Sequence, residues 1–238
     1  MDPAGRGVTF RPSSPTLLGP GTVVTAFHDP RVLDHGAVVW SGDRIVAVGD
    51  AAELAAAHPD AAKLNARNGL ILPGLVNLHH HFYSSLARGL DPGRRLESFG
   101  EILDGLWWRL DRALDEETVR ISAALAATDS IRWGATTVFD HHASPSFIRR
   151  SLDTIAEVTT AAGLAAVLCY EISDRNGSDD ALEGLEENLA FFDARREDPA
   201  VRGMLGLHAS FTVGEATMRA VTERRLPGIG CHVHLAED

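Results

Sequence analysis

Residues 70–81 read LILPGLVNLHHH, an apolar run that ends in three consecutive histidines. A run this rich in Leu, Ile and Val is typical of a buried β-strand, and it predicts one strand over Leu70–Leu78. Alternate side chains of a strand share a face, so His79 and His81 point the same way while His80 points away. Two imidazoles that converge at a strand end are suited to a transition-metal ion such as zinc or iron.

The chain beyond this run alternates short apolar runs with longer segments of helical period. We expect further strands over Thr136–Asp140, Ala165–Glu171, Met204–Ala209 and Ile229–Leu235. We expect helices over Glu117–Arg132, Ser144–Ala162, Ala181–Arg196 and Glu215–Arg224. Alternation of buried strands with helices implies parallel βαβ units, whose strands end at the same edge of a sheet.

Shorter elements upstream of the run indicate a separate β module. We expect strands over Thr22–Phe27, Gly36–Trp40 and Arg44–Val48, and then a helix over Ala51–Ala57.

Histidines also lie at the carboxyl ends of three of the later predicted strands: His141 and His142, then His208, then His232 and His234. His234 is favoured over His232 as a third metal ligand, because His232 lies a layer deeper. Glu237 follows His234 by three residues, and a carboxylate beside a metal is suited to move a proton. A lone histidine at a strand end more often packs in the core, so the His-x-His pairs carry this interpretation.

The run LPGLVNLHHH at 72–81, together with HLAE at 234–237, resembles the metal-dependent amidohydrolase superfamily. Within it, further segments resemble the triazine chlorohydrolases and aromatic deaminases, and are similar to the SsnA-type aminohydrolases. These segments are FYSSLARG at 82–89, LWWRLD at 106–111, DHHASP at 140–145 and HASFT at 208–212.

The resemblance implies an α/β fold built on a distorted (β/α)8 TIM-type barrel, with a small β-sandwich beside it. On this basis residues 1–69 are the N-terminal part of the sandwich and residues 70–238 are the first part of the barrel, truncated after about strand five. The family pattern also has a strand-six His and a strand-eight Asp, and both would lie beyond Asp238. We therefore expect the sequence to be part of a longer protein.

The resemblance also implies one divalent metal, with zinc favoured over iron, held by His79, His81 and His234. Glu237 would be the proton shuttle and His208 would orient the substrate. A carboxylated lysine bridges the two metals of binuclear members at the strand-four position, which His208 occupies here, and the only lysine is Lys63. A mononuclear centre is therefore favoured.

The expected reaction is hydrolytic deamination, by metal-activated water, of an amino-substituted heterocycle of the purine, pyrimidine or triazine type. A chlorohydrolase and a cyclic amidase on the same metal remain open alternatives. A catalytically inactive fragment or scaffold is a further alternative from another class.

Substrate contacts are predicted near the ends of two strands and in one aromatic segment. Glu171, with Asp174 and Arg175 in the loop that follows, lies where a polar ring edge could be bound, or these residues could cap the loop. His142 is a candidate for substrate contact or for support of a ligand. Trp108, with Trp107, would cover the site or pack in the core.

Composition excludes several other classes of function. The chain has 22 Lys and Arg against 33 Asp and Glu, a formal net charge of −11, which argues against nucleic acid and anionic membranes as partners. No apolar run is long enough to span a membrane. Cys169 and Cys231 are the only cysteines, too few for a disulfide framework. We therefore expect a cytoplasmic protein with a small-molecule substrate, with a homodimer as an open expectation.

Overall fold

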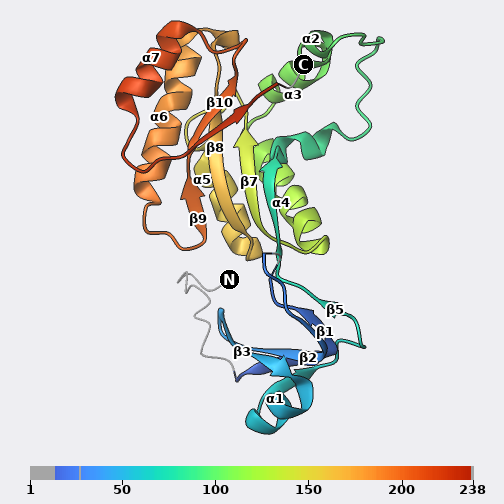
Figure 1. Cartoon of the computed structure of the whole chain (residues 1–238). Coiled ribbons are helices and arrows are strands. Elements are labelled where there is room, and N and C mark those ends of the chain that lie inside the picture. Colours follow the sequence, from blue (N-terminus) through green and yellow to red (C-terminus); the bar gives the residue numbers. More distant parts are fainter. Residues whose placement is uncertain (1–13, 27, 237–238) are drawn as a thin grey trace, which may run out of the picture. The chain divides into compact units, whose positions relative to one another are not determined.

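The computed structural model describes residues 14–26 and 28–236. The chain divides between Pro73 and Gly74 into two compact units, each with its own sheet. Figure 1 shows the two units, coloured along the sequence.

The first unit is a small mixed sheet with one helix. Its elements are β1 (Thr16–Val24), β2 (Val32–Ser41), β3 (Arg44–Asp50), α1 (Ala51–Ala57), β4 (Ala62–Leu64) and β5 (Leu70–Ile71). The strand order is β3-β2-β1-β4, and β5 pairs with β1 in parallel. The predicted helix is confirmed at both bounds, and Asp50 caps it by accepting hydrogen bonds from the N–H groups of Ala52 and Glu53. The predicted first strand is wrong at both ends, because β1 begins at Thr16 and ends at Val24.

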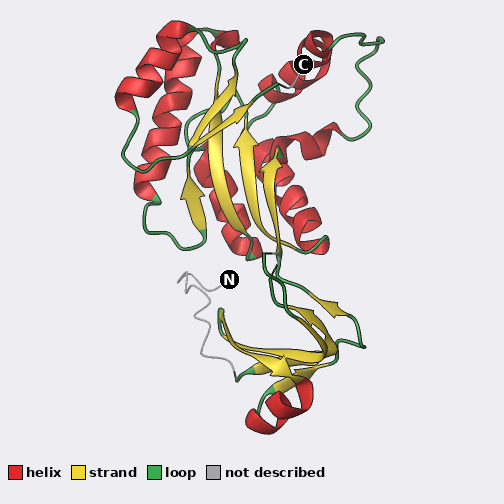
Figure 2. Ribbon diagram, viewed as in Figure 1, coloured by secondary structure: helices red, strands yellow, loops and turns green. Residues whose placement is uncertain are grey.

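The second unit is a parallel sheet with helices between its strands (Figure 2). Its strands are β6 (Leu75–His80), β7 (Ala135–His142), β8 (Ala165–Ile172), β9 (Val201–Gly203), β10 (Leu205–Ala209) and β11 (Cys231–His234). Its helices are α2 (Phe99–Ile102), α3 (Trp108–Arg112), α4 (Glu116–Arg132), α5 (Ser151–Ala162), α6 (Ser178–Ala194) and α7 (Glu215–Arg224). Shorter helical turns cover Phe82–Ala87, Leu103–Trp107 and Asp174–Asn176. The strand order β11-β10-β8-β7-β6 brings the carboxyl ends of all five strands to one edge.

The single strand predicted over Leu70–Leu78 is wrong. The run is divided at Pro73 and Gly74, so that its first part is β5 of the first unit and its second part is β6 of the second. Pro73 has no N–H to donate to a sheet. Gly74 lies so close to the side chain of Thr136 that a Cβ at position 74 would collide with it.

The helix predicted from Ser144 begins at Ser151 instead, because the residues between form turns and Arg150 adopts a left-handed conformation, with φ of 66°. No side chain of its own first turn caps this helix. Glu187 of α6 takes that place, since it accepts hydrogen bonds from the N–H groups of Arg150 and Leu152. A charged residue of one helix thereby fixes where its neighbour begins.

A buried amide fills a break in the sheet beside β8. The edge of β8 pairs first with β9 and then, from Glu171 onward, with β10. At the break, the side chain of Asn188 accepts from the N–H of Tyr170 and donates to its carbonyl oxygen, both at 2.8 Å. Asn188 is fully buried, and its side-chain amide makes the two hydrogen bonds with the backbone of Tyr170 that a neighbouring strand would otherwise make.

The main core of the second unit lies between the sheet and helices α4 and α5, and includes Phe82, Val138, Leu152, Ile155 and Leu168. A second core, which includes Ile172, Leu185 and Ile229, lies where α6 and α7 meet β8 and β10. Both cores hold the strands in place below their carboxyl ends. Among the described residues no helix is both long and apolar enough to cross a bilayer.

Candidate metal centre and substrate cavity

The carboxyl ends of three strands bring four histidines together. His79 lies near the end of β6, with His81 directly after that strand, while His208 lies in β10 and His234 ends β11. His79, His81 and His234 each offer a ring nitrogen, and these atoms lie within 4.8 Å of one another. The structure thus brings together the three residues that the sequence predicted as metal ligands.

Two of these rings are held in one tautomer by the backbone. Nδ1 of His81 is 2.7 Å from the carbonyl oxygen of His141, and Nδ1 of His234 is 2.8 Å from that of His208. A carbonyl oxygen can only accept, so each Nδ1 carries the hydrogen and each Nε2 of a neutral ring carries a lone pair. Burial lowers the pKa of His81 to about 3, so this ring is neutral near pH 7.

The two lone pairs face each other, which favours a cation between them. Nε2 of His81 and Nε2 of His234 are 3.2 Å apart. Two nitrogens bound to one tetrahedral zinc ion, with Zn–N bonds of about 2.0 Å, lie about 3.3 Å apart. The donor set therefore fits a divalent metal that prefers imidazole.

His79 of β6, two residues before His81, completes the group. Its Nδ1 is 3.0 Å from Nε2 of His232, so His79 would use Nε2 for a metal. His232 thereby supports a ligand in the way that second-layer groups orient metal-binding histidines.

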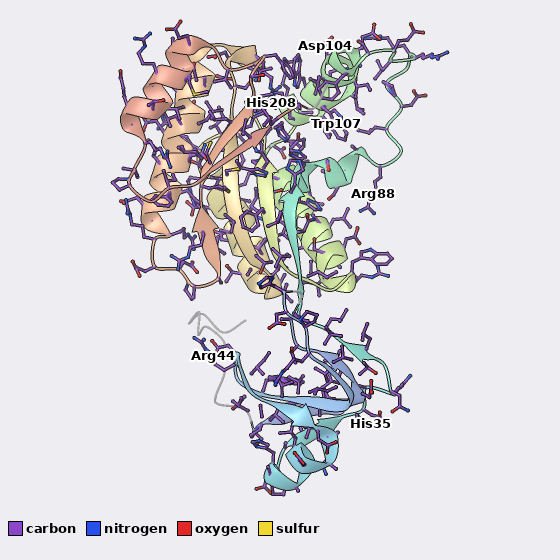
Figure 3. The ribbon with its side chains drawn as sticks, viewed as in Figure 1. His35, Arg44, Arg88, Asp104, Trp107 and His208 are labelled. Carbon is purple, nitrogen blue, oxygen red and sulfur yellow. The ribbon has the colours of Figure 1, made fainter. Side chains whose placement is uncertain are left out.

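A cavity of about 270 Å³ opens beside the three histidines. Besides these histidines, its lining is aromatic and apolar with a few acidic and polar groups: Tyr83, Ser84, Phe99, Leu103, Trp107, Trp108, Asp111, Glu171 and His208. Figure 3 labels Trp107 and His208, which lie near the carboxyl ends of the strands. A cavity of this kind is suited to a flat heterocycle whose polar edge is held by a few side chains.

Three buried charges fix one wall of the cavity. Arg175 donates to Asp111 at 2.6 Å and to Glu171 at 2.9 Å, and all three side chains are at most 5% exposed. Burial raises the pKa of both acids, that of Asp111 to about 6. The guanidinium that the two carboxylates share lowers both pKa values but does not offset the effect of burial. The guanidinium also lies over the ring of Trp108, 5.4 Å from its centre.

His208 lies between this wall and the metal ligands. Its Nδ1 is 2.6 Å from the hydroxyl of Thr212, and its Nε2 is 3.9 Å from a carboxylate oxygen of Glu171. The carbonyl of the same residue holds His234. One residue of β10 therefore contacts the cavity with its ring and a candidate ligand with its backbone.

The other predicted site residues lie elsewhere. His142 is fully buried and is not part of the cavity lining; its Nε2 is 2.8 Å from the hydroxyl of Ser144, and its ring contacts Tyr83. Asp174 anchors the start of α7 by accepting from the N–H of Gly214 and the hydroxyl of Thr217. Glu237 lies outside the described residues.

Asp111 was not among the predicted site residues, although it lies within the segment LWWRLD. Nor were Tyr83, Phe99 and Leu103. An acid in an otherwise aromatic segment is a signal for Asp111. Phe99 and Leu103 carry no such signal, because their place depends on how residues 90–113 pack.

Comparison with known proteins places these features in a family. Residues 70–238 match the amidohydrolase family, and residues 36–61 match the imidazolonepropionase-like composite domain of bacteria. The 5'-deoxyadenosine deaminase of Methanosarcina barkeri is 28% identical over 90% of this chain and 47% of its own length. The 8-oxoguanine deaminase of Pseudomonas aeruginosa is 28% identical over 85% of this chain and 48% of its own length.

A solved structure described as an adenosine deaminase from Xanthomonas campestris with bound zinc has a similar fold. The TM-score is 0.69 at 23% identity, over 92% of this chain and 48% of the other. The chain thus spans about half the length of the curated relatives and of the solved structure that it matches.

Proposed function

Because the chain belongs to the amidohydrolase family and has its TIM-barrel-like fold, we propose that it forms the metal-binding part of an active site that hydrolyses a non-peptide C–N bond. The observation that carries the proposal is the pair of Nε2 atoms of His81 and His234, which face each other 3.2 Å apart at the rim of the cavity. With His79 they would hold one divalent metal, zinc in preference to iron. A bound metal of this kind would act as a Lewis acid and lower the pKa of its bound water to about 7.

The substrate that we propose is an amino-substituted purine or a related heterocycle, with ammonia as the leaving group. The relatives named for deamination of 5'-deoxyadenosine and 8-oxoguanine support this class. Trp107 and Trp108 would cover the faces of the ring, and Glu171 would accept hydrogen bonds from its polar edge. Arg175 holds Glu171 in place for that contact.

His208 would orient the reacting carbon, since its ring lies between Glu171 and the carboxyl end of β11. Glu237 would transfer the proton between water and the leaving group. His142 would act indirectly, by packing against Tyr83 of the cavity wall.

The roles of these residues are predictions. So are the N-terminal β-sandwich and the domain boundary between residues 69 and 70. Assembly into a homodimer and a cytoplasmic location are predictions as well. The chlorohydrolase, cyclic amidase and scaffold alternatives also remain. The two enzyme alternatives differ from deamination in the product that is released, and a scaffold would release none.

The test is a screen for ammonia release with zinc-loaded protein, on 5'-deoxyadenosine, adenosine, guanine and 8-oxoguanine. It uses the 238-residue chain and, beside it, the product of the complete gene. We expect ammonia from at least one compound, and its loss in Glu237→Gln but not in Glu223→Gln, an exposed acid of α7. Release of chloride from a chlorotriazine, or a ring-opened product without ammonia, would favour an alternative. No product from folded, metal-loaded protein would favour the scaffold.

A further inference from the structure

A second group of metal-binding side chains lies on the far side of His232 from His79. His141 of β7, Cys169 of β8 and His232 of β11 each offer one ligand atom, and these atoms lie within 4.8 Å of one another. The Sγ of Cys169 is 3.7 Å from Nδ1 of His141 and 3.8 Å from Nδ1 of His232. On a tetrahedral zinc ion, with a Zn–S bond of about 2.3 Å and a Zn–N bond of about 2.0 Å, sulfur and nitrogen lie about 3.5 Å apart.

The Nδ1 atoms of His141 and His232 both face the Sγ of Cys169. His141 is fully buried, and its Nε2 has no hydrogen-bond partner among the described residues. By contrast, His81 and His234 are each tied to a carbonyl oxygen. Nδ1 of His141 instead faces the Sγ of Cys169, 3.7 Å away, so the two atoms are placed to bind one metal ion.

A glycine in the intervening strand makes room for the group. Gly206 of β10 pairs with His232 on one side and with Glu171 on the other. A Cβ at position 206 would collide with the carbonyl of Tyr170 and lie 3.0 Å from the Sγ of Cys169. The absence of a side chain at this position lets Cys169 approach His232 across the strand.

We propose that His141, Cys169 and His232 bind a second divalent ion, zinc or another metal that accepts thiolate and imidazole together. The ligand set is softer than that of His79, His81 and His234, because it contains sulfur. As the metal binds, the thiol hydrogen of Cys169 leaves to solvent as a proton. When His79 also binds the first ion through Nε2, its Nδ1 donates to Nε2 of His232, so the hydrogen on Nδ1 of His232 leaves to solvent as a second proton. Without the metal, burial raises the pKa of the Cys169 thiol well above its usual range, so the thiol stays protonated near the carbonyl oxygen of Asp140, 3.5 Å away.

The site does not depend on the proposed deaminase activity, and cobalt(II) tests it directly. A thiolate bound to cobalt gives a charge-transfer band in the near ultraviolet, whereas cobalt bound only by imidazole does not. We expect this band when cobalt is titrated into the metal-free 238-residue chain, with one thiolate-bound ion per chain at saturation. Cys169→Ser should lose the band, while Cys231→Ser, which changes the exposed cysteine, should keep it. His81→Ala, which impairs the first site, should also keep it.

Three results would overturn the proposal. One is a wild-type chain that binds cobalt without a thiolate band, which needs no variant to fold. The others are a band that survives in Cys169→Ser, and a band that disappears in Cys231→Ser. Far-ultraviolet circular dichroism of each variant verifies that a lost band reflects a lost ligand. If the wild-type chain shows the band and His81→Ala binds as much cobalt as the wild type, the second site stands. That result would contradict only the site of His79, His81 and His234.

Discussion

The Nε2 atoms of His81 and His234 lie 3.2 Å apart, although the two residues are 153 positions apart in the sequence. Each ring is oriented by a carbonyl oxygen of a neighbouring strand, that of His141 for His81 and that of His208 for His234. The orientation is therefore set by the register of the sheet, and the metal ligands depend on the backbone around them.

Loss of Arg175 should destabilise the fold strongly. Arg175→Ala leaves Asp111 and Glu171 buried without their guanidinium, and we expect a loss of about 3–5 kcal/mol in the free energy of unfolding. Urea denaturation of the metal-free chain measures it. The matched control is Arg149→Ala, which removes an exposed ion pair with Glu183 and should cost at most about 1 kcal/mol. Equal losses in the two variants would contradict the account of the buried wall.

Asn188 should matter for stability although it touches no site residue. Asn188→Ala leaves the N–H and the carbonyl of Tyr170 without their partners at the break in the sheet, and we expect a loss of about 2–4 kcal/mol. Asn176→Ala, which removes one hydrogen bond to Arg112, should change stability by no more than about 1 kcal/mol. A small effect at Asn188 would mean that water replaces the amide.

The pH dependence of stability should reveal Glu187. Burial raises its pKa above 4.5, against the hydrogen bonds from Arg150 and Leu152. Above pH 4.5 the folded state still holds a proton that the unfolded state has released. The stability that Glu187 contributes to the folded state is therefore lost as the pH rises above 4.5. Compared with Glu187→Gln, the wild-type chain should become less stable as the pH rises above 4.5. Parallel curves for the two proteins, from urea denaturation at each pH, would contradict the shift.

Glu171 should affect substrate binding more than metal binding. Glu171→Gln keeps the shape of the side chain but weakens its pairing with Arg175 and its contact with a polar ring edge. On a heterocycle that releases ammonia, we expect KM to rise roughly tenfold, equivalent to about 1.4 kcal/mol, with metal content unchanged. Glu186→Gln, an exposed acid paired with Arg224, is the control. A drop in kcat with unchanged KM would assign Glu171 to the reaction instead.

The sequence was informative where chemistry is local. The His-x-His pairs, the parallel βαβ alternation and the helix over Ala51–Ala57 follow from periodicity and residue type. Pro73 and Gly74 are a signal that a strand ends, but the apolar residues on both sides favoured one continuous strand over Leu70–Leu78. The start of α5 was not predictable, because Glu187 of another helix determines it.

Long-range packing explains what the sequence could not provide. Asn188 fills a gap beside β8, which cannot be known before β9 and β10 are seen as separate strands. Asp111 reaches the cavity only because Arg175, 64 positions away, pairs with it. The approach of Cys169 to His232 likewise depends on Gly206 in the strand between them.

The measurement that tests the central claim most directly is elemental analysis of zinc-loaded protein in a Cys169→Ser background, which removes the sulfur ligand of the second site. The account predicts about one zinc ion per chain, lost in His81→Ala and in His234→Ala and retained in His35→Ala, a change at an exposed histidine of the first unit. A folded protein that binds no zinc, or that keeps its zinc when His81 and His234 are both replaced, would contradict it.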